Sequence, residues 1–310
     1  MKAVVIEQYG KAEELIEREM PKPEISENQV LVELYATSIN PIDWKVREGY
    51  MKDTIPLPFP AILGWDAAGV VRDTGANVTD FQAGDDVFAR PAMENGTYAQ
   101  YAAIDANLLA KKPADISFQD AAAVPLAGLT AWQCLVDFSA IQSGDKVLIH
   151  AGSGGVGSLA IQIAKSFGAY VVSTASGKNE ALLKSLGVDE FINYEQTDFA
   201  DVVQDADIVL DTLGGDILEK SHDILKAGGR LVSIAGEPDQ RRAEANQLKA
   251  DSLWLNPNGK QLAQLGQLME QGEVKPIIGH TFPLTQEGLR EAHRLSETHH
   301  AKGKIVITEK

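Results

Sequence analysis

The stretch KVLIHAGSGGVGSLAIQIAK, residues Lys146 to Lys165, decides the fold of this chain. It begins with a short apolar run typical of a buried strand, passes through a cluster of glycines, and continues with apolar residues at helical spacing. Gly152, Gly154 and Gly157 fit the pattern G-x-G-x-x-G. Between a strand and a helix this pattern indicates dinucleotide binding. The first glycine permits a tight turn, the second lets the backbone approach a pyrophosphate, and the third lets the helix pack closely.

The start of the following helix adds to this interpretation. Its free N–H groups and the positive end of its dipole suit a phosphate. We therefore expect Ser153, Gly155 and Val156 to surround the pyrophosphate together with the three glycines. The alternative is a plain glycine-rich strand–turn–helix, which the neighbouring elements make the weaker interpretation.

Strands and helices alternate on both sides of the glycine turn. Strands are expected at 147–150, 170–174, 208–211 and 231–235, and helices at 156–167, 180–186, 217–225 and 259–271. An earlier helix is expected over 119–138, with a break or kink at Pro125. This alternation predicts βαβ units in a doubly wound parallel sheet of the Rossmann type. The first half of the chain is instead rich in short strands separated by Gly, Pro and Asp.

The end of the second strand predicts which dinucleotide binds. A site that prefers NAD usually carries an acid about 20 residues past the turn, where it binds the ribose 2′-hydroxyl. This chain has Thr174, Ser176 and Lys178 there, with no acid before Glu180. Hydroxyls and an ammonium suit a 2′-phosphate, so we expect NADP(H). An ordinary solvated lysine is the alternative for Lys178.

Composition excludes several classes of function. The chain has 310 residues, a formal net charge of -16 and a single cysteine, Cys134. The negative charge disfavours nucleic acid and anionic membranes, because both require Lys and Arg to neutralise phosphates. No apolar run is long enough to span a bilayer and no leader pattern precedes Glu7. We expect a cytoplasmic protein with no nucleic-acid or membrane partner.

With these residues in hand, the chain resembles the medium-chain dehydrogenase/reductase superfamily, in its zinc-free quinone oxidoreductase and enone reductase branch. The resemblance covers nearly the whole chain and rests on the order and spacing of eight stretches: SINPIDWKVREG (38–49), PAILGWDAAGVV (60–71), FQAGDDVFA (81–89), GTYAQYAAI (96–104), AAAVPLAGLTAW (121–132), HAGSGGVG (150–157), LDTLGG (210–215) and AKGKIVI (301–307).

This resemblance implies an α/β protein with two domains. A discontinuous GroES-like, β-rich catalytic domain would comprise residues 1–117 and 276–310, and a Rossmann NADP(H)-binding domain would comprise residues 118–275. The insertion would explain why the glycine turn lies in the middle of the chain, and the active site would lie in the cleft between the domains. The branch often forms homodimers.

The resemblance also implies the catalytic residues. Zinc-dependent relatives place a Cys near the position of Asn40 and Gly-His-Glu where this chain has Gly64-Trp65-Asp66, and they carry a four-cysteine lobe that is absent here. We therefore expect no metal. Donors must then stabilise charge on a carbonyl oxygen, for which Asn40 and Lys45 are the candidates, with an ordinary solvated lysine as the alternative for Lys45. Asp43 would orient its neighbours, and a turn-stabilising contact is the alternative for it. The aromatic residues expected to line the substrate pocket are Trp44, Tyr50 and Trp65.

Further cofactor contacts follow from the same matched stretches. Thr130 is expected at the head of the helix that joins the domains, and Tyr194 beside the 2′-phosphate. Leu213, Gly214, Ala235 and Gly236 follow strands and would line the nicotinamide cleft. Lys304 begins the last strand and is expected to touch cofactor or substrate.

Two functions from different classes fit these residues. The first is a zinc-independent oxidoreductase that transfers hydride from NADPH to a quinone or an α,β-unsaturated carbonyl. Conjugation activates such acceptors, so they need less help from the protein than simple ketones. The second is an NADPH-binding sensor or scaffold with little turnover. A short-chain dehydrogenase is disfavoured because the chain contains no Tyr-x-x-x-Lys.

Overall fold

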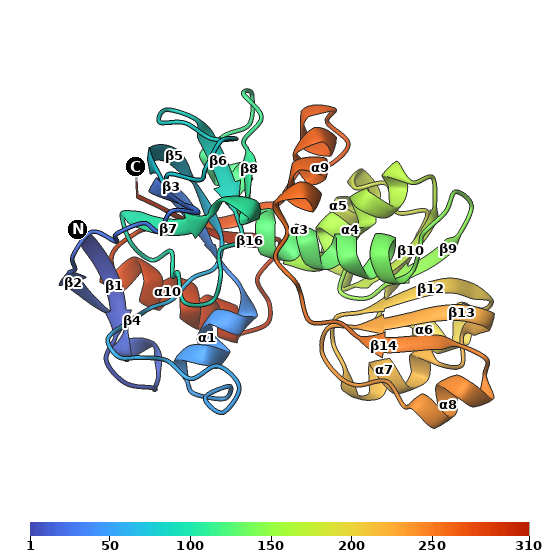
Figure 1. The fold of residues 1–310 in the computed structure, drawn as a ribbon. Coiled ribbons are helices and arrows are strands. Elements are labelled where there is room, and N and C mark those ends of the chain that lie inside the picture. The colour runs from blue at the N-terminus through green and yellow to red at the C-terminus, as the bar shows by residue number, and fades with distance from the viewer. Residues whose placement is uncertain (310) are drawn as a thin grey trace. The chain divides into compact units, whose positions relative to one another are not determined.

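The computed structural model describes residues 1–309, which form two compact units. Unit 1 comprises Met1–Leu129, Pro257–Gly272 and Pro276–Lys310, and unit 2 comprises Thr130–Asn256 and Glu273–Lys275. Each unit has its own sheets, shown in Figure 1. No helix within residues 1–309 is long and apolar enough to cross a bilayer.

Unit 2 is built on a six-stranded parallel sheet. Its strands are β9 (Lys146–Ile149), β10 (Tyr170–Ala175), β11 (Glu190–Asn193), β12 (Ala206–Asp211), β13 (Leu225–Ser233) and β14 (Lys249–Ser252). The order across the sheet is β11-β10-β9-β12-β13-β14, and every pair is parallel. In chain order this is 3-2-1-4-5-6, the doubly wound order of dinucleotide-binding folds. The predicted Rossmann topology is therefore confirmed.

Helices cover this sheet on both faces. Figure 1 shows α4 on one side of it and α7 on the other. Alternate strand residues, such as Leu148, Val172 and Val209, pack with Leu218 of α7 in one apolar cluster, because neighbouring side chains of a strand point to opposite faces. The helices of this unit are α4 (Gly155–Ser166), α5 (Glu180–Ser185), α6 (Phe199–Val202), α7 (Gly215–Ser221) and α8 (Gln240–Ala245), with a π-helical segment at Gln133–Phe138.

Unit 1 is rich in antiparallel strands. A seven-stranded sheet has the order β15-β16-β3-β5-β6-β8 with β7 also paired to β3, and a smaller sheet has the order β2-β1-β4. The strands are β1 (Lys2–Ile6), β2 (Ile16–Glu19), β3 (Gln29–Ile39), β4 (Ala61–Ile62), β5 (Ala67–Thr74), β6 (Asp86–Ala89), β7 (Tyr101–Asp105), β8 (Leu109–Lys111), β15 (Ile278–Pro283) and β16 (Lys304–Thr308). The last strand, β16, pairs antiparallel with β3, so the end of the chain returns to the sheet formed by its first hundred residues.

Four helices and part of a fifth belong to unit 1. They are α1 (Pro41–Arg47), α2 (Phe118–Ala122), α9 (Gly259–Glu270), α10 (Gln286–Glu297) and the first residues of α3 (Pro125–Trp132). Thr285 caps α10 by accepting the Gly288 N–H at 3.1 Å. Leu289, Ala292 and His293 then lie on the buried face of that helix.

Some local predictions differ from the observed elements. The helix expected over 119–138 is interrupted before Pro125, as predicted, because proline cannot donate to the preceding turn. The helix expected over 217–225 ends at Ser221, and Leu225 already begins β13. The division into units falls after Leu129, where 117 was predicted. It also assigns α9 to unit 1, because α9 packs on β8 with Gly259 against the Leu109 carbonyl.

Candidate active site

Helix α1 positions two of the predicted catalytic residues. Asn40 is its N-cap with an extended backbone, and Pro41 occupies the first helical position, where a missing N–H costs nothing. Asp43 lies three residues after the cap, and its Oδ2 accepts the Asn40 N–H at 3.0 Å. This is the reciprocal half of a capping box. The sequence N-P-I-D therefore fixes Asn40 and Asp43 relative to each other.

Asn40 is the centre of a buried polar cluster. Its Nδ2 donates to Asp66 Oδ2 at 2.7 Å, and its Oδ1 accepts from the Lys304 ammonium. Because an ammonium can only donate and a carboxylate oxygen accepts, Lys304 and Asp66 fix the orientation of the Asn40 amide. All three residues are at most 3% exposed.

Asp66 holds this cluster together. Its Oδ2 also lies 3.3 Å from Lys304 Nζ and accepts from the hydroxyl of Ser38. Its Oδ1 accepts the backbone N–H of Leu126 at 2.7 Å. A buried carboxylate costs free energy unless hydrogen-bond donors and a cation compensate for the water it has lost. Asp66 has several donors and a cationic partner, so its contacts hold it in one position.

Asp43 is fully buried beside this cluster. Burial raises the pKa of its carboxyl to about 7, against the lowering effect of hydrogen bonds from the Asn40 N–H and the Tyr98 hydroxyl, and the negative charge of Asp66 adds to the rise. Its Oδ1 has no hydrogen-bond partner within residues 1–309. Asp43 therefore changes charge near neutral pH.

A directional chain of hydrogen bonds leads from Asp43 to the side of α10. Tyr98 donates to Asp43 at 2.7 Å, and its hydroxyl lies 3.0 Å from His293 Nε2. His293 Nδ1 lies 3.0 Å from Arg47 Nη1. An arginine can only donate, so His293 carries its proton on Nε2. Burial, together with the charge of Arg47, lowers the pKa of His293 to about 3, so the ring is neutral.

Arg47 is the last residue in this series of hydrogen bonds. Its Nη2 contacts Glu297 Oε1 at 2.7 Å and Glu48 Oε1 at 2.8 Å, and both carboxylates are partly exposed. The guanidinium cannot release a proton at physiological pH. The series of hydrogen bonds from Asp43 to Arg47 therefore orients Asp43 and does not conduct protons to solvent.

Other predicted catalytic and pocket residues lie elsewhere. Lys45 is exposed, with its ammonium 5.8 Å from the centre of the Trp44 ring, so the structure does not bring it into the Asn40 cluster. Trp44 is half-buried and meets Tyr50, which is 71% exposed, edge to face. Trp65 is fully buried among Leu63 and other core residues and donates to the Met93 carbonyl. Its position is that of a core residue and not of an open pocket wall.

The glycine turn in unit 2 has the geometry that its spacing predicts. A Cβ at Gly157 would lie 2.4 Å from the Ala151 carbonyl oxygen, and one at Gly152 would lie 2.1 Å from Ser173 Oγ. At Gly154 a Cβ would lie 3.3 Å from the Ala151 carbonyl oxygen, which is a tight contact, although no other atom lies within 4 Å. Gly155 and Val156 begin α4, and no side chain caps that helix. The turn therefore fits a dinucleotide pyrophosphate, with Ser153 beside it.

Two of the predicted 2′-phosphate contacts, Ser176 and Lys178, lie in the turn after β10, and a third, Thr174, lies near the end of β10 itself. Thr174 is buried: its Oγ1 lies 3.2 Å from His150 Nδ1 and accepts the Ala151 N–H, so it supports the glycine turn from behind. Ser176 is also buried and accepts from Asn179 at 3.1 Å. Lys178 is exposed, and so is Tyr194 on the next loop.

Two buried side chains, Asp211 and Ser233, hold the loops after β12 and β13, and neither was predicted from the sequence. Asp211 accepts the backbone N–H groups of Leu213 and Gly214 at 3.0 to 3.1 Å, and Ser233 donates to it at 2.6 Å. Ser233 in turn accepts the N–H groups of Ala235 and Gly236. The four predicted loop residues therefore have fixed backbones at the carboxyl end of the sheet, where this fold class binds ligands.

One further prediction is corrected. Thr130 is buried, and it is the sixth residue of α3, so it does not lie at the head of that helix. Lys304, which was expected to touch cofactor or substrate, belongs to unit 1 and directs its ammonium to Asn40 and Asp66, and its contact with either molecule stays a prediction. The sequence alone could not pair Lys304 with Asp66, because they come from distant segments.

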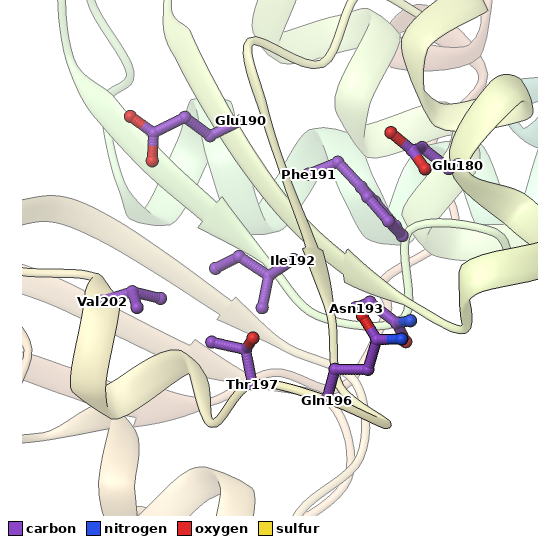
Figure 2. Close-up of a pocket in the computed structure, with 8 residues that line it drawn as sticks. All are labelled: Glu180, Glu190, Phe191, Ile192, Asn193, Gln196, Thr197 and Val202. Carbon is purple, nitrogen blue, oxygen red and sulfur yellow. The ribbon is translucent and has the colours of Figure 1, made fainter.

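An open hollow of about 440 Å³ lies along β11. None of the predicted cofactor residues lines it. Figure 2 shows its lining residues, with Glu190 and Asn193 at opposite ends of the strand: Glu180, Glu190, Phe191, Ile192, Asn193, Gln196, Thr197 and Val202. Within residues 1–309 no three or more His, Cys, Asp or Glu side chains are grouped so that they could hold a metal ion.

Comparison with known proteins places this chain in a family. Residues 26–114 match the alcohol dehydrogenase GroES-like domain, and residues 186–307 match a zinc-binding dehydrogenase domain. An NADPH-dependent alkenal/one oxidoreductase of Arabidopsis thaliana is 38% identical over 99% of this chain and 79% of its own length. The chain belongs to the medium-chain dehydrogenase/reductase superfamily, in its quinone oxidoreductase branch. Unit 1 is thus a GroES-like domain, and unit 2 is a Rossmann domain.

Other members of the superfamily cover almost the full chain. The chloroplast envelope quinone oxidoreductase homolog of Arabidopsis thaliana is 32% identical over 99% of this chain and 98% of its own length. Among solved structures, the quinone oxidoreductase of Coxiella burnetii has a TM-score of 0.90 at 36% identity and covers 100% of this chain and 99% of its own. The Escherichia coli quinone oxidoreductase, solved with NADPH, has a TM-score of 0.89 at 28% identity and covers 99% of this chain and 100% of its own.

Proposed function

We propose that this chain is an NADPH-dependent reductase of α,β-unsaturated carbonyls or quinones that works without a catalytic metal. Relatives named as alkenal/one, methylene-furanone and quinone oxidoreductases support the class of acceptor. The observation that carries the proposal is the buried cluster of Asn40, Lys304 and Asp66, which supplies fixed hydrogen-bond donors.

The glycine turn supports NADP(H) as the cofactor. The absence of a side chain at Gly154 and the uncapped start of α4 fit a pyrophosphate, and Ser176 with Lys178 would receive the 2′-phosphate. When bound, the reduced nicotinamide supplies the hydride. Asp211 and Ser233 would keep the backbone of the loops at the carboxyl end of the sheet in place.

Unit 1 would polarise the acceptor. The Lys304 ammonium has three N–H groups and directs two of them to Asn40 and Asp66, and the Asn40 amide directs one of its two N–H groups to Asp66. Each residue therefore retains one donor for a carbonyl oxygen. Negative charge that develops on that oxygen would be stabilised by a preorganised amide and a buried cation, which cost no reorganisation during the reaction.

The donor set does not fit zinc. Zinc is bound by Cys, His and carboxylate ligands, usually three of them at a catalytic site. At the positions where zinc-dependent relatives carry Cys and Gly-His-Glu, Asn40 and Trp65 offer an amide and an indole. Only Asp66 keeps a carboxylate, and it already pairs with Lys304 and the Leu126 N–H. The proposed reaction therefore assigns the polarising role to Lys304 and Asn40. The homodimer and the cytoplasmic location stay predictions.

The proposed activity is tested by NADPH oxidation in EDTA-treated protein, followed by absorbance. A simple enone and a benzoquinone should be reduced, and a primary alcohol with NADP⁺ should not be oxidised. Tight NADPH binding with no acceptor reduced would favour the sensor or scaffold. Activity that appears only after zinc is added would contradict the metal-free mechanism.

A further inference from the structure

The turn after β10 receives a carboxylate from the loop that follows β11. Glu195 Oε2 accepts the backbone N–H of Gly177 at 3.2 Å. The Glu195 N–H in turn donates to Asn193 Oδ1 at 3.1 Å, which closes a short turn and directs the loop toward Gly177. An acid therefore lies at this turn, although it comes 15 residues after Glu180 in the sequence and belongs to the next strand's loop.

The same turn is tied to the glycine turn. Asn179 Nδ2 donates to Ser176 Oγ at 3.1 Å and to Ser153 Oγ at 3.2 Å. Ser153 lies in the glycine turn, so the position of Gly177 relative to the pyrophosphate cradle is fixed by these bonds. A ribose at the end of the second strand would therefore meet the Gly177 backbone and the Glu195 carboxylate together.

Lys178 has no counter-ion in this arrangement. Its side chain is exposed, and its ammonium forms no hydrogen bond or ion pair with any residue in the range 1–309. Glu195 is also exposed and bonds to the backbone of the residue beside Lys178. A 2′-phosphate with two negative charges would be attracted by the ammonium and repelled by the carboxylate.

We propose that Glu195 is a specificity-determining residue: its carboxylate occupies the Gly177 N–H and repels a ribose 2′-phosphate, so it lowers the preference for NADPH over NADH that Lys178 sets. This inference rests on the proposed dinucleotide site. It concerns the strength of cofactor discrimination and leaves the chemistry in unit 1 unchanged.

The test compares two adenosine probes, 2′,5′-ADP and 5′-AMP, by calorimetry. In Glu195→Gln the amide oxygen can still accept the Gly177 N–H, but the charge is gone. The variant should bind 2′,5′-ADP about 3- to 10-fold more tightly, while the affinity for 5′-AMP changes less than about 2-fold. The gain should shrink when salt is raised, because surface charges are screened.

Glu190→Gln is the matched control. Glu190 begins β11, the strand that precedes the loop of Glu195, and accepts from the Tyr170 hydroxyl at 2.7 Å. Its substitution makes the same change in net charge. Figure 2 shows it at the opposite end of β11 from Asn193. Its replacement should leave both affinities within about 2-fold, because the carboxylate lies several residues along an extended strand from the site. Lys178→Ala should weaken binding of 2′,5′-ADP alone.

Three outcomes would overturn the inference. In Glu195→Gln, 2′,5′-ADP could bind no more tightly, or both probes could tighten equally, or Glu190→Gln could give the same gain. These results leave the proposed dinucleotide site standing. Failure of the wild-type protein to bind either probe would instead remove the proposed cofactor site, and this inference with it.

Discussion

The buried polar cluster of unit 1 and the glycine turn of unit 2 are both suited to a charged ligand group, but they are built from different parts of the protein. In unit 1 the cluster of Asn40, Asp66 and Lys304 is built from buried side chains that come from three separate segments. In unit 2 the turn at Gly152–Gly157 offers backbone groups and glycines without side chains, all from one continuous segment. Charged side chains that are paired in advance make a site sensitive to the loss of one partner. A backbone cradle is sensitive to added atoms.

The largest effect is expected from breaking the buried ion pair. Asp66→Asn or Lys304→Met should each lower the free energy of unfolding by about 3–5 kcal/mol, because each leaves an uncompensated charge or donor buried. The double variant should recover part of this loss. Denaturant unfolding followed by circular dichroism measures it. Single variants that lose less than about 1 kcal/mol would show that the pair is not structurally coupled.

A smaller effect is expected in the glycine turn, where one substitution should lower the stability and another should lower the affinity for NADPH. Gly157→Ala places a Cβ 2.4 Å from the Ala151 oxygen and 2.8 Å from the Gly152 Cα, so it should cost about 2–3 kcal/mol of stability. In Gly154→Ala the only close contact of the Cβ is the Ala151 oxygen at 3.3 Å, so this variant should lose less stability than Gly157→Ala and lose about 10- to 100-fold in affinity for NADPH. Unfolding and calorimetric titration of both variants check this, and a reversed pattern would contradict the cradle.

The smallest effect concerns the pH dependence of stability. The pKa of Asp43 is raised to about 7 by burial, so the native state holds a proton that the unfolded chain has already released above pH 4. The contribution of Asp43 to the free energy of unfolding is therefore fully present below pH 4 and is lost as pH rises through 7. Asp43→Asn removes the titration, so relative to the variant the wild type should lose roughly 1–3 kcal/mol between pH 4 and 8.

The difference in stability between the wild type and Asp43→Asn isolates the titration of Asp43. His293 and His150 have pKa values lowered by burial, so they contribute a rise of stability with pH over the acidic range in both proteins. Thermal unfolding at a series of pH values measures the difference. A difference that stays constant with pH would mean that Asp43 ionises normally in the folded state.

The same contrast explains what the sequence could predict. The glycine turn and the order of its strands follow from local spacing, because one segment contains the strand, the turn and the helix. Asn40 was found through its motif. The partners that orient it, Asp66 and Lys304, could not be found from spacing, since Lys304 reaches the site only when β16 pairs with β3. Glu195 was missed for the same reason, because it approaches Gly177 from the neighbouring strand's loop.

Lys45 shows the converse case. It is close to Asn40 in sequence, and its charge made it a plausible donor. It lies exposed near the Trp44 ring, however, and not in the buried cluster. In the mechanism that we propose, the cation is instead Lys304, from the last strand of the chain.

The most direct test of the account is a single-turnover measurement with Asn40→Ala. NADPH oxidation by a simple enone is followed by stopped flow at saturating cofactor, and NADPH binding is measured separately. The account predicts that hydride transfer slows by about 100-fold, because one preorganised donor is lost, while the affinity for NADPH stays within about 2-fold. An unchanged transfer rate, or a loss that appears only in NADPH affinity, would contradict the assignment of Asn40 and its cluster to the polarisation of the acceptor.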